Sequence, residues 1–312
     1  MRDKGLPVYT VEQEELALRE VNITTAQMFA TVMQDADISL EVIRCALPHL
    51  HPERVQVQTA LDDGAPEVEK TIMAAAFAHA VRMDVYYNNG QSVINLEMQV
   101  RDMKGSHGLS MLPLRARYND AMLTLHQLPA GKEYDKLLPT YVIFLCTFDA
   151  YGQGAYLYSF ERTCKEVPGL TMGDQTYTLF FNTKGKRGEI TPRMRMLLDY
   201  MNDPGRYPMT EGTDPLIQKI EKSVGYYKQS REWRENYMLT TVQYYDQRLI
   251  GMEEGEKKGE KKGERKTLYR IMQTLTQQNL PDSYIAQTLM LTEAELADLR
   301  ANPTVQEDET NV

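Results

Sequence analysis

The fold of this chain is decided by the stretch Arg82-Met-Asp-Val-Tyr-Tyr-Asn-Asn-Gly-Gln-Ser-Val-Ile-Asn-Leu-Glu-Met-Gln99. Its centre holds Asn-Asn-Gly at positions 88–90. Because Asn and Gly tolerate the positive φ of hairpin turns, this triplet predicts a tight turn. Apolar and polar residues alternate on both sides of it, with the period of a strand that buries one face. The stretch therefore predicts a β-hairpin.

Each predicted strand has an apolar face and a polar face. On the second strand the apolar face carries Ile94, Leu96, Met98 and Val100, and the polar face carries Asn95, Glu97 and Gln99. On the first strand Val81, Met83, Val85 and Tyr87 lie opposite Arg82, Asp84 and Tyr86. A two-residue turn at 89–90 would pair Asp84 with Asn95 and place Glu97 on the diagonal of the same face, where Cβ atoms lie about 7–8 Å apart.

One divalent cation can bridge two carboxylates at that separation, so the hairpin predicts a metal site. Asp84 and Glu97 would be ligands, and the backbone carbonyl of Met98 is available on the same strand. Gln99, two residues beyond the glutamate, would orient a water or contact a phosphate. The same pattern also fits a solvent-facing hairpin surface. Asp is disfavoured within strands, and the polar face lacks Lys and Thr, which favours a site.

Composition limits the function classes. The chain has 312 residues, 42% hydrophobic and 25% charged, which is ordinary globular material. Its three scattered cysteines, Cys45, Cys146 and Cys164, favour a reducing cytosol over a disulfide framework or a zinc ribbon. The longest apolar stretch, 141–148, is too short to span a membrane. The net charge of −9 counts against a nucleic-acid partner without excluding one, since bound metal offsets site carboxylates.

Helical and strand patterns alternate in the first part of the chain, which predicts an α/β domain built on one sheet. We expect a helix over 25–47, broken near 35–37 with Asp37 as N-cap of the second piece, and another over 113–128. Strands are expected at 141–148, 156–160 and 175–181. The predicted parts are an N-terminal extension (1–22), the α/β domain (23–185), a helical extension (186–250), a Gly/Glu/Lys linker (251–266), a small helical unit (267–300) and a disordered tail (301–312).

Glycine recurs at every fourth position of the linker, which predicts a weak helix or a flexible tether, because each glycine costs about 1 kcal/mol against alanine. Beyond it, 267–300 predicts a helical pair with a capping box at Thr292 and Glu295. A helix-turn-helix shape fits this unit, but 285–291 carries no basic residue that could reach a base edge. The pattern favours packing or homo-oligomerisation through these helices.

An ordered series of motifs resembles the Rpn family of recombination-promoting nucleases, also described as PD-(D/E)XK nuclease family transposases. The motifs are Met28-Phe-Ala-Thr-Val-Met-Gln-Asp35, Glu41-Val-Ile-Arg-Cys-Ala-Leu47, Arg82-Met-Asp-Val-Tyr86, Asn95-Leu-Glu-Met-Gln99, Leu112-Pro-Leu-Arg-Ala-Arg-Tyr118, Gly131-Lys-Glu-Tyr-Asp135, Tyr141-Val-Ile-Phe144, Phe148-Asp149 and Tyr237-Met238. The resemblance implies a restriction-endonuclease-like fold with a mixed central sheet flanked by helices. It implies a cytoplasmic DNA endonuclease that depends on Mg²⁺ or Mn²⁺, linked to recombination, mobile elements or phage defence.

The resemblance also implies roles by position. Asp84 and Glu97 would be metal ligands, and Gln99 stands where the wider superfamily has a catalytic lysine. Glu41 lies on the first core helix, where a further acidic residue can join the site. By analogy, the substrate phosphates would be contacted by Arg115, Arg117 and Tyr118. The alternative is a catalytically weak or inactive nuclease-fold protein that binds DNA or a protein partner.

Overall fold

The computed structural model describes residues 11–50, 67–68, 71–72, 81–104, 110–128 and 133–302. The chain divides into two compact units, residues 1–235 and 236–312. The first is an α/β unit with a mixed sheet flanked by helices, and the second is helical, which confirms the predicted class. The expected boundary at residue 185 lies inside the first unit, because α5 (Pro192–Asn202) and α6 (Pro215–Gln229) pack against its N-terminal helices.

Among the described residues, the main sheet has six strands. Their order across the sheet is β1 (Glu67–Val68), β4 (Val85–Asn88), β5 (Val93–Gln99), β6 (Thr140–Cys146), β8 (Thr176–Asn182) and β7 (Leu157–Phe160). The three central strands β5, β6 and β8 are parallel, and the outer strands run antiparallel to their neighbours. Every residue of β5 and β6 is buried, as expected of strands covered by helices on both faces.

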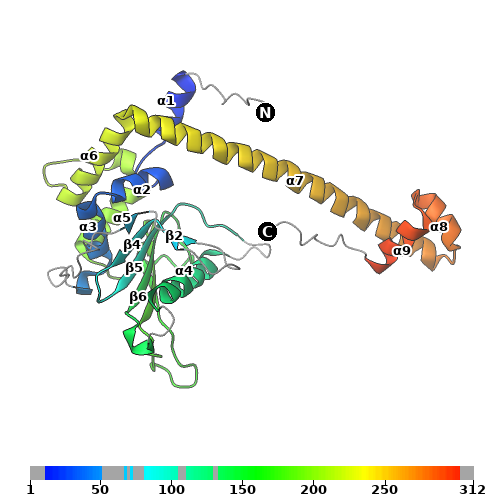
Figure 1. Cartoon of the computed structure of the whole chain (residues 1–312), viewed down its shortest axis with the longest axis horizontal. Coiled ribbons are helices and arrows are strands. Elements are labelled where there is room, and N and C mark those ends of the chain that lie inside the picture. The colour runs from blue at the N-terminus through cyan, green and yellow to red at the C-terminus, as the bar shows by residue number, and fades with distance from the viewer. Residues whose placement is uncertain are drawn as a thin grey trace. The chain divides into compact units, whose positions relative to one another are not determined.

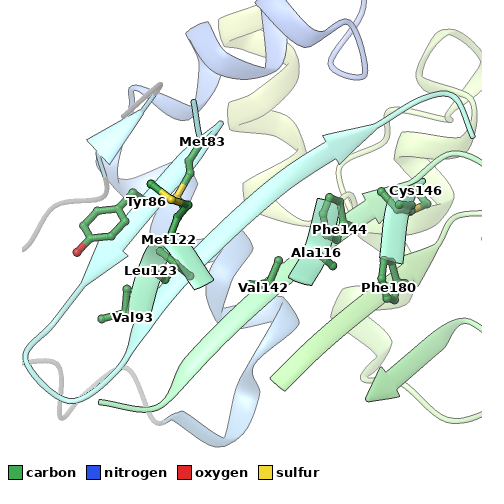
Figure 2. Packing of buried hydrophobic residues seen from close by; sticks show 11 residues of the cluster. Met83, Tyr86, Val93, Ala116, Met122, Leu123, Val142, Phe144, Cys146 and Phe180 are labelled. Carbon is green, nitrogen blue, oxygen red and sulfur yellow. The ribbon is translucent and has the colours of Figure 1, made fainter. Parts of the chain in front are cut away.

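Helices cover the two faces of this sheet (Figure 1). On one face lies α4 (Leu112–Gln127), which packs on β6. On the other side are α2 (Ala26–Met33) and α3 (Ala36–Ala46), and α1 (Val11–Arg19) precedes them. Figure 2 shows the apolar core beneath α4, which joins Ala116, Met122 and Leu123 of the helix to Val93, Val142, Phe144 and Phe180 of the strands.

The hairpin is present, but the predicted register is wrong by two residues. Tyr86 pairs with Asn95, and the turn has four residues, 89–92. The Asn89 side chain explains this turn, because its Oδ1 accepts hydrogen bonds from the N–H groups of Gln91 (2.9 Å) and Ser92 (2.8 Å). Gly90 adopts the expected positive φ of 74°. Extending this register places Asp84 opposite Glu97 instead of Asn95.

The first strand is also shorter than predicted. It divides into β3 (Val81–Arg82), which pairs with β2 (Thr71–Ile72), and β4, with a break at 83–84. At the break, Oδ2 of Asp84 accepts a hydrogen bond of 2.9 Å from the backbone N–H of Met98. In a continuous strand, a backbone carbonyl would accept this hydrogen bond. Here the Asp84 carboxylate accepts it instead, so the buried N–H of Met98 is satisfied.

The expected break in the first helical segment is confirmed, but its N-cap is Asp35, and the prediction of Asp37 is wrong. The Asp35 carboxylate accepts from the N–H groups of Asp37 (3.0 Å) and Ile38 (3.2 Å), so the helix begins at Ala36.

In the second part of the chain, α7 (Arg231–Gln277) includes the glycine-rich segment 251–266. The small helical unit is confirmed as α8 (Asp282–Leu289) and α9 (Glu293–Ala301), packed with the end of α7 around Met272 and Ile285, with the predicted capping box at Thr292. Residues 303–312 of the predicted disordered tail lie outside the described residues. Where the structure describes the chain, its helices include none with a stretch apolar enough to cross a bilayer.

Candidate functional site

The polar residues of β5 lie on the face of the sheet that α4 covers. Asn95 and Glu97 are 0% exposed and Gln99 is 8% exposed. The residues that pair with them on β6 are Val142, Phe144 and Cys146, all apolar and buried. The polar face is therefore buried. The alternative interpretation of the hairpin, a solvent-facing surface, is wrong. Burial of these polar groups is costly unless each finds a partner.

Both oxygens of Glu97 have partners. Oε1 accepts from the side-chain amide of Asn95 at 2.8 Å, and Oε2 forms an ion pair with the guanidinium of Arg115 on α4. The backbone N–H of Asp84 also donates to this carboxylate. Asn95 is itself held by Asn119 of α4, whose amide donates to Oδ1 of Asn95 at 3.0 Å. Two side chains of α4 thus hold two side chains of β5.

Arg115 also joins Glu97 to Gln99. A second guanidinium nitrogen donates to Oε1 of Gln99 at 2.9 Å, and Nε2 of Gln99 donates to the carbonyl of Arg101 at 2.6 Å. The side chain of Arg115 is 36% exposed, so its charge reaches the surface while the carboxylate it neutralises is buried. The amide of Gln99, which the sequence analysis assigned to water or phosphate, is occupied by protein groups.

The electrostatics of the site follow from this geometry. Burial, reinforced by the Asp84 carboxylate, raises the pKa of Glu97 to about 7. Arg115 and the hydrogen bond from Asn95 oppose this rise. Asp84 and Glu97 are therefore close enough to repel each other, and a cation beside both would relieve the repulsion. This supports the predicted proximity of the two carboxylates, reached through a register that the sequence analysis did not predict.

The residues present fit a hard divalent cation. Carboxylate and carbonyl oxygens are its preferred donors, and Mg²⁺ binds through one or two carboxylates together with water and substrate phosphate. Asp84 and Glu97 supply that number, and the carbonyl of Met98 adds an oxygen on the same strand. Of the residues that the structure describes, no group of three or more His, Cys, Asp and Glu side chains is arranged to hold a metal ion. The candidate site thus rests on two carboxylates.

The other predicted site residues lie apart from this pair. Glu41 forms ion pairs with Arg44 and Arg193, so its carboxylate is engaged in a network on α3 and α5. Burial raises the pKa of Glu41, but the hydrogen bonds from these two arginines outweigh it and lower the pKa below its ordinary value. Arg117 and Tyr118 are exposed on α4.

Sequence reasoning missed the role of Asn119. It follows Arg115 by four residues and so lies on the same face of α4, a signal that could have identified it once Arg115 was a candidate. It also missed that Asn95 is the hydrogen-bond partner of Glu97.

Comparison of the chain with protein-family models, with curated proteins and with solved structures finds no match.

Proposed function

We propose that this chain is a divalent-metal-dependent DNA endonuclease with a restriction-endonuclease-like fold, of the kind that the Rpn-like motifs imply. The observation that carries the proposal is the buried Glu97 carboxylate beside Asp84, held by residues of α4 at the break in the first hairpin strand. A buried carboxylate beside a second, partly buried one is costly for stability and is typical of a functional site.

In this proposal Asp84 and Glu97 bind the cation. Bound Mg²⁺ or Mn²⁺ would supply an activated water and neutralise charge on the scissile phosphate. Asn95 and Asn119 hold the Glu97 carboxylate in one orientation. Arg115, half-exposed at the edge of the site, is the group suited to exchange its contact with Glu97 for a contact with a substrate phosphate. Gln99 keeps that guanidinium in place.

A second candidate function is favoured by one observation. Arg115 pairs with Glu97, and Gln99 provides no positive charge where the wider superfamily has a lysine. A chain with this arrangement would serve as a nuclease-fold module that binds DNA or a protein partner and does not cleave.

The test of the enzymatic proposal is nicking of supercoiled plasmid by the full chain in Mg²⁺ or Mn²⁺. We expect cleavage with metal, none in a chelator, and a loss of about 100-fold or more for Asp84→Ala, since a metal ligand supplies several kcal/mol. Asp135→Ala is the matched control, because that side chain is 61% exposed and pairs only with the exposed Lys136 where the structure describes it.

Two outcomes would overturn the enzymatic proposal: no cleavage in either metal, or cleavage that survives Asp84→Ala. DNA retention that survives Asp84→Ala but is lost on removal of residues 251–312 would support the second candidate instead.

A further inference from the structure

An open pocket of about 430 Å³ lies on the other flank of α4 from Arg115. Its walls come from α4 on one side and from β7, β8 and the loop before β7 on the other. That volume is in the range of small-molecule sites, which is about 300–1,000 Å³. The residues that determine its chemistry are Arg117, Asp120, Tyr151, Phe160, Arg162 and Phe180.

Three of these residues make an aromatic wall. Tyr151, Phe160 and Phe180 contact one another, with ring centroids 5.0 Å apart for Tyr151 and Phe160 and 5.9 Å apart for Phe160 and Phe180. Phe160 is 44% exposed, so one ring of the wall is accessible to a ligand. Planar aromatic ligands stack on such rings, and every nucleic-acid base has a face that can do so.

The polar groups of the pocket have complementary charge. Asp120 is only 8% exposed, and its buried Oδ1 has no hydrogen-bond partner among the groups that the structure describes. Its other oxygen lies 3.9 Å from a guanidinium nitrogen of Arg162, too far for a hydrogen bond. The Thr140 side chain hydrogen-bonds to the Asp120 carboxylate. Arg162 itself pairs with Asp174 at 2.5 Å. Arg117 is exposed at the rim. The pocket thus offers a buried carboxylate that accepts N–H donors and, from Arg117, one exposed guanidinium that attracts phosphate; a second carboxylate, that of Glu161, also lines it.

The pocket adjoins the candidate active site through two ring contacts. Phe180 stacks on Phe144 with centroids 5.3 Å apart, and the guanidinium of Arg115 lies 5.9 Å from the centre of the Phe144 ring. Arg115 in turn pairs with Glu97. These contacts run through the core, because Phe144 is 0% exposed and Phe180 is 2% exposed, so they link the two sites beneath α4 and not along the surface.

We propose that this pocket binds an unpaired DNA base that carries an exocyclic amino group, such as cytosine, with the ring stacked on Phe160 and the amino group donating to Asp120. The inference rests on the proposed function for its choice of DNA as the partner. Acidic side chains accept hydrogen bonds from the amino group of cytosine, whereas thymine carries a carbonyl oxygen at that position, which Asp120 would repel.

The test is binding of the wild-type full chain, in a chelator and at mildly alkaline pH, to fluorescent oligo(dC) and oligo(dT) of equal length. We expect oligo(dC) to bind about tenfold more tightly, because one base-specific contact contributes roughly 1–3 kcal/mol. Phe160→Ala should weaken binding of both oligonucleotides by about tenfold through loss of stacking. Asp120→Asn should abolish the preference, since an amide can also donate to the thymine oxygen.

The matched control is Tyr226→Ala, which removes an aromatic ring that is 69% exposed on α6 and should leave binding unchanged. Equal affinity of the wild-type protein for both oligonucleotides, or a preference that survives Asp120→Asn, would overturn the inference, as would tighter binding of duplex DNA that Phe160→Ala does not weaken. The assay needs no cleavage. Binding that depends on the pocket, without nicking, would support this inference and contradict the endonuclease proposal. Nicking without binding that depends on the pocket would support the endonuclease proposal and contradict this inference.

Discussion

β5 and β6 are adjacent parallel strands of seven residues, both buried along their whole length, yet they lie under α4 with opposite chemistry. The register places Glu97 beside Phe144. On β6 the apolar side chains stabilise the fold by burial alone. On β5 the polar side chains are tolerated only because Asn119 and Arg115 match them. The strand that departs from core chemistry is the one that carries the candidate site, as expected where function competes with stability.

The largest effect should come from the apolar strand. We expect Phe144→Ala to lower the free energy of unfolding by about 3–5 kcal/mol, since it leaves a cavity against Phe180. Urea denaturation measures this loss. Leu125→Ala on α4, where the side chain is 69% exposed, should change it by about 0.5 kcal/mol or less. Equal losses for the two variants would mean that β6 is not the core of this face.

On the polar strand, removing the matching charge should cost less. We expect Arg115→Met to lower the free energy of unfolding by about 2 kcal/mol, because it leaves Glu97 buried without its cation. The figure is discounted from that of a fully buried pair, since the Arg115 side chain is 36% exposed.

Adding Glu97→Gln to Arg115→Met should recover much of that loss, because the uncompensated charge is then gone. Arg231→Met is the control: Arg231 pairs with Glu235 on the surface of α7, where such pairs contribute little to stability, so the free energy of unfolding should hardly change. A double variant as unstable as Arg115→Met would show that packing, not charge, explains the effect.

The comparison also shows what sequence could predict. Alternation identified the hairpin, the polar face and the proximity of Asp84 to Glu97. It could not determine the register, because that depended on side-chain hydrogen bonds of Asn89 inside the turn. Nor could it show that the polar face is covered, since a solvated face and a face under a helix have the same period. The ion pair of Glu41 with Arg193 could not be predicted for a similar reason, because Arg193 is 152 residues away in sequence.

A smaller effect should come from the second contact between α4 and β5. Asn119→Ala removes the donor to Oδ1 of Asn95, and we expect a loss of about 1 kcal/mol in the free energy of unfolding. A double-mutant cycle with Asn95→Ala tests whether the two side chains act together. The two losses should be less than additive. Full additivity would contradict the idea that α4 holds the polar row of β5 in place.

The smallest effect should come from Asp120, a buried carboxylate on α4. Burial raises the pKa of Asp120, and Thr140 and Arg162 oppose this only in part. The pKa of Asp120 is therefore higher in the folded chain than in the unfolded chain, where it is about 3.9. Below the unfolded pKa the carboxyl group is protonated in both states and costs no stability. As the pH rises through the folded pKa, the stability of the chain falls. Asp120→Asn should therefore raise Tm slightly at neutral pH and match the wild type at low pH. A wild-type protein more stable than the variant at neutral pH would mean that the Asp120 charge is compensated in the folded chain.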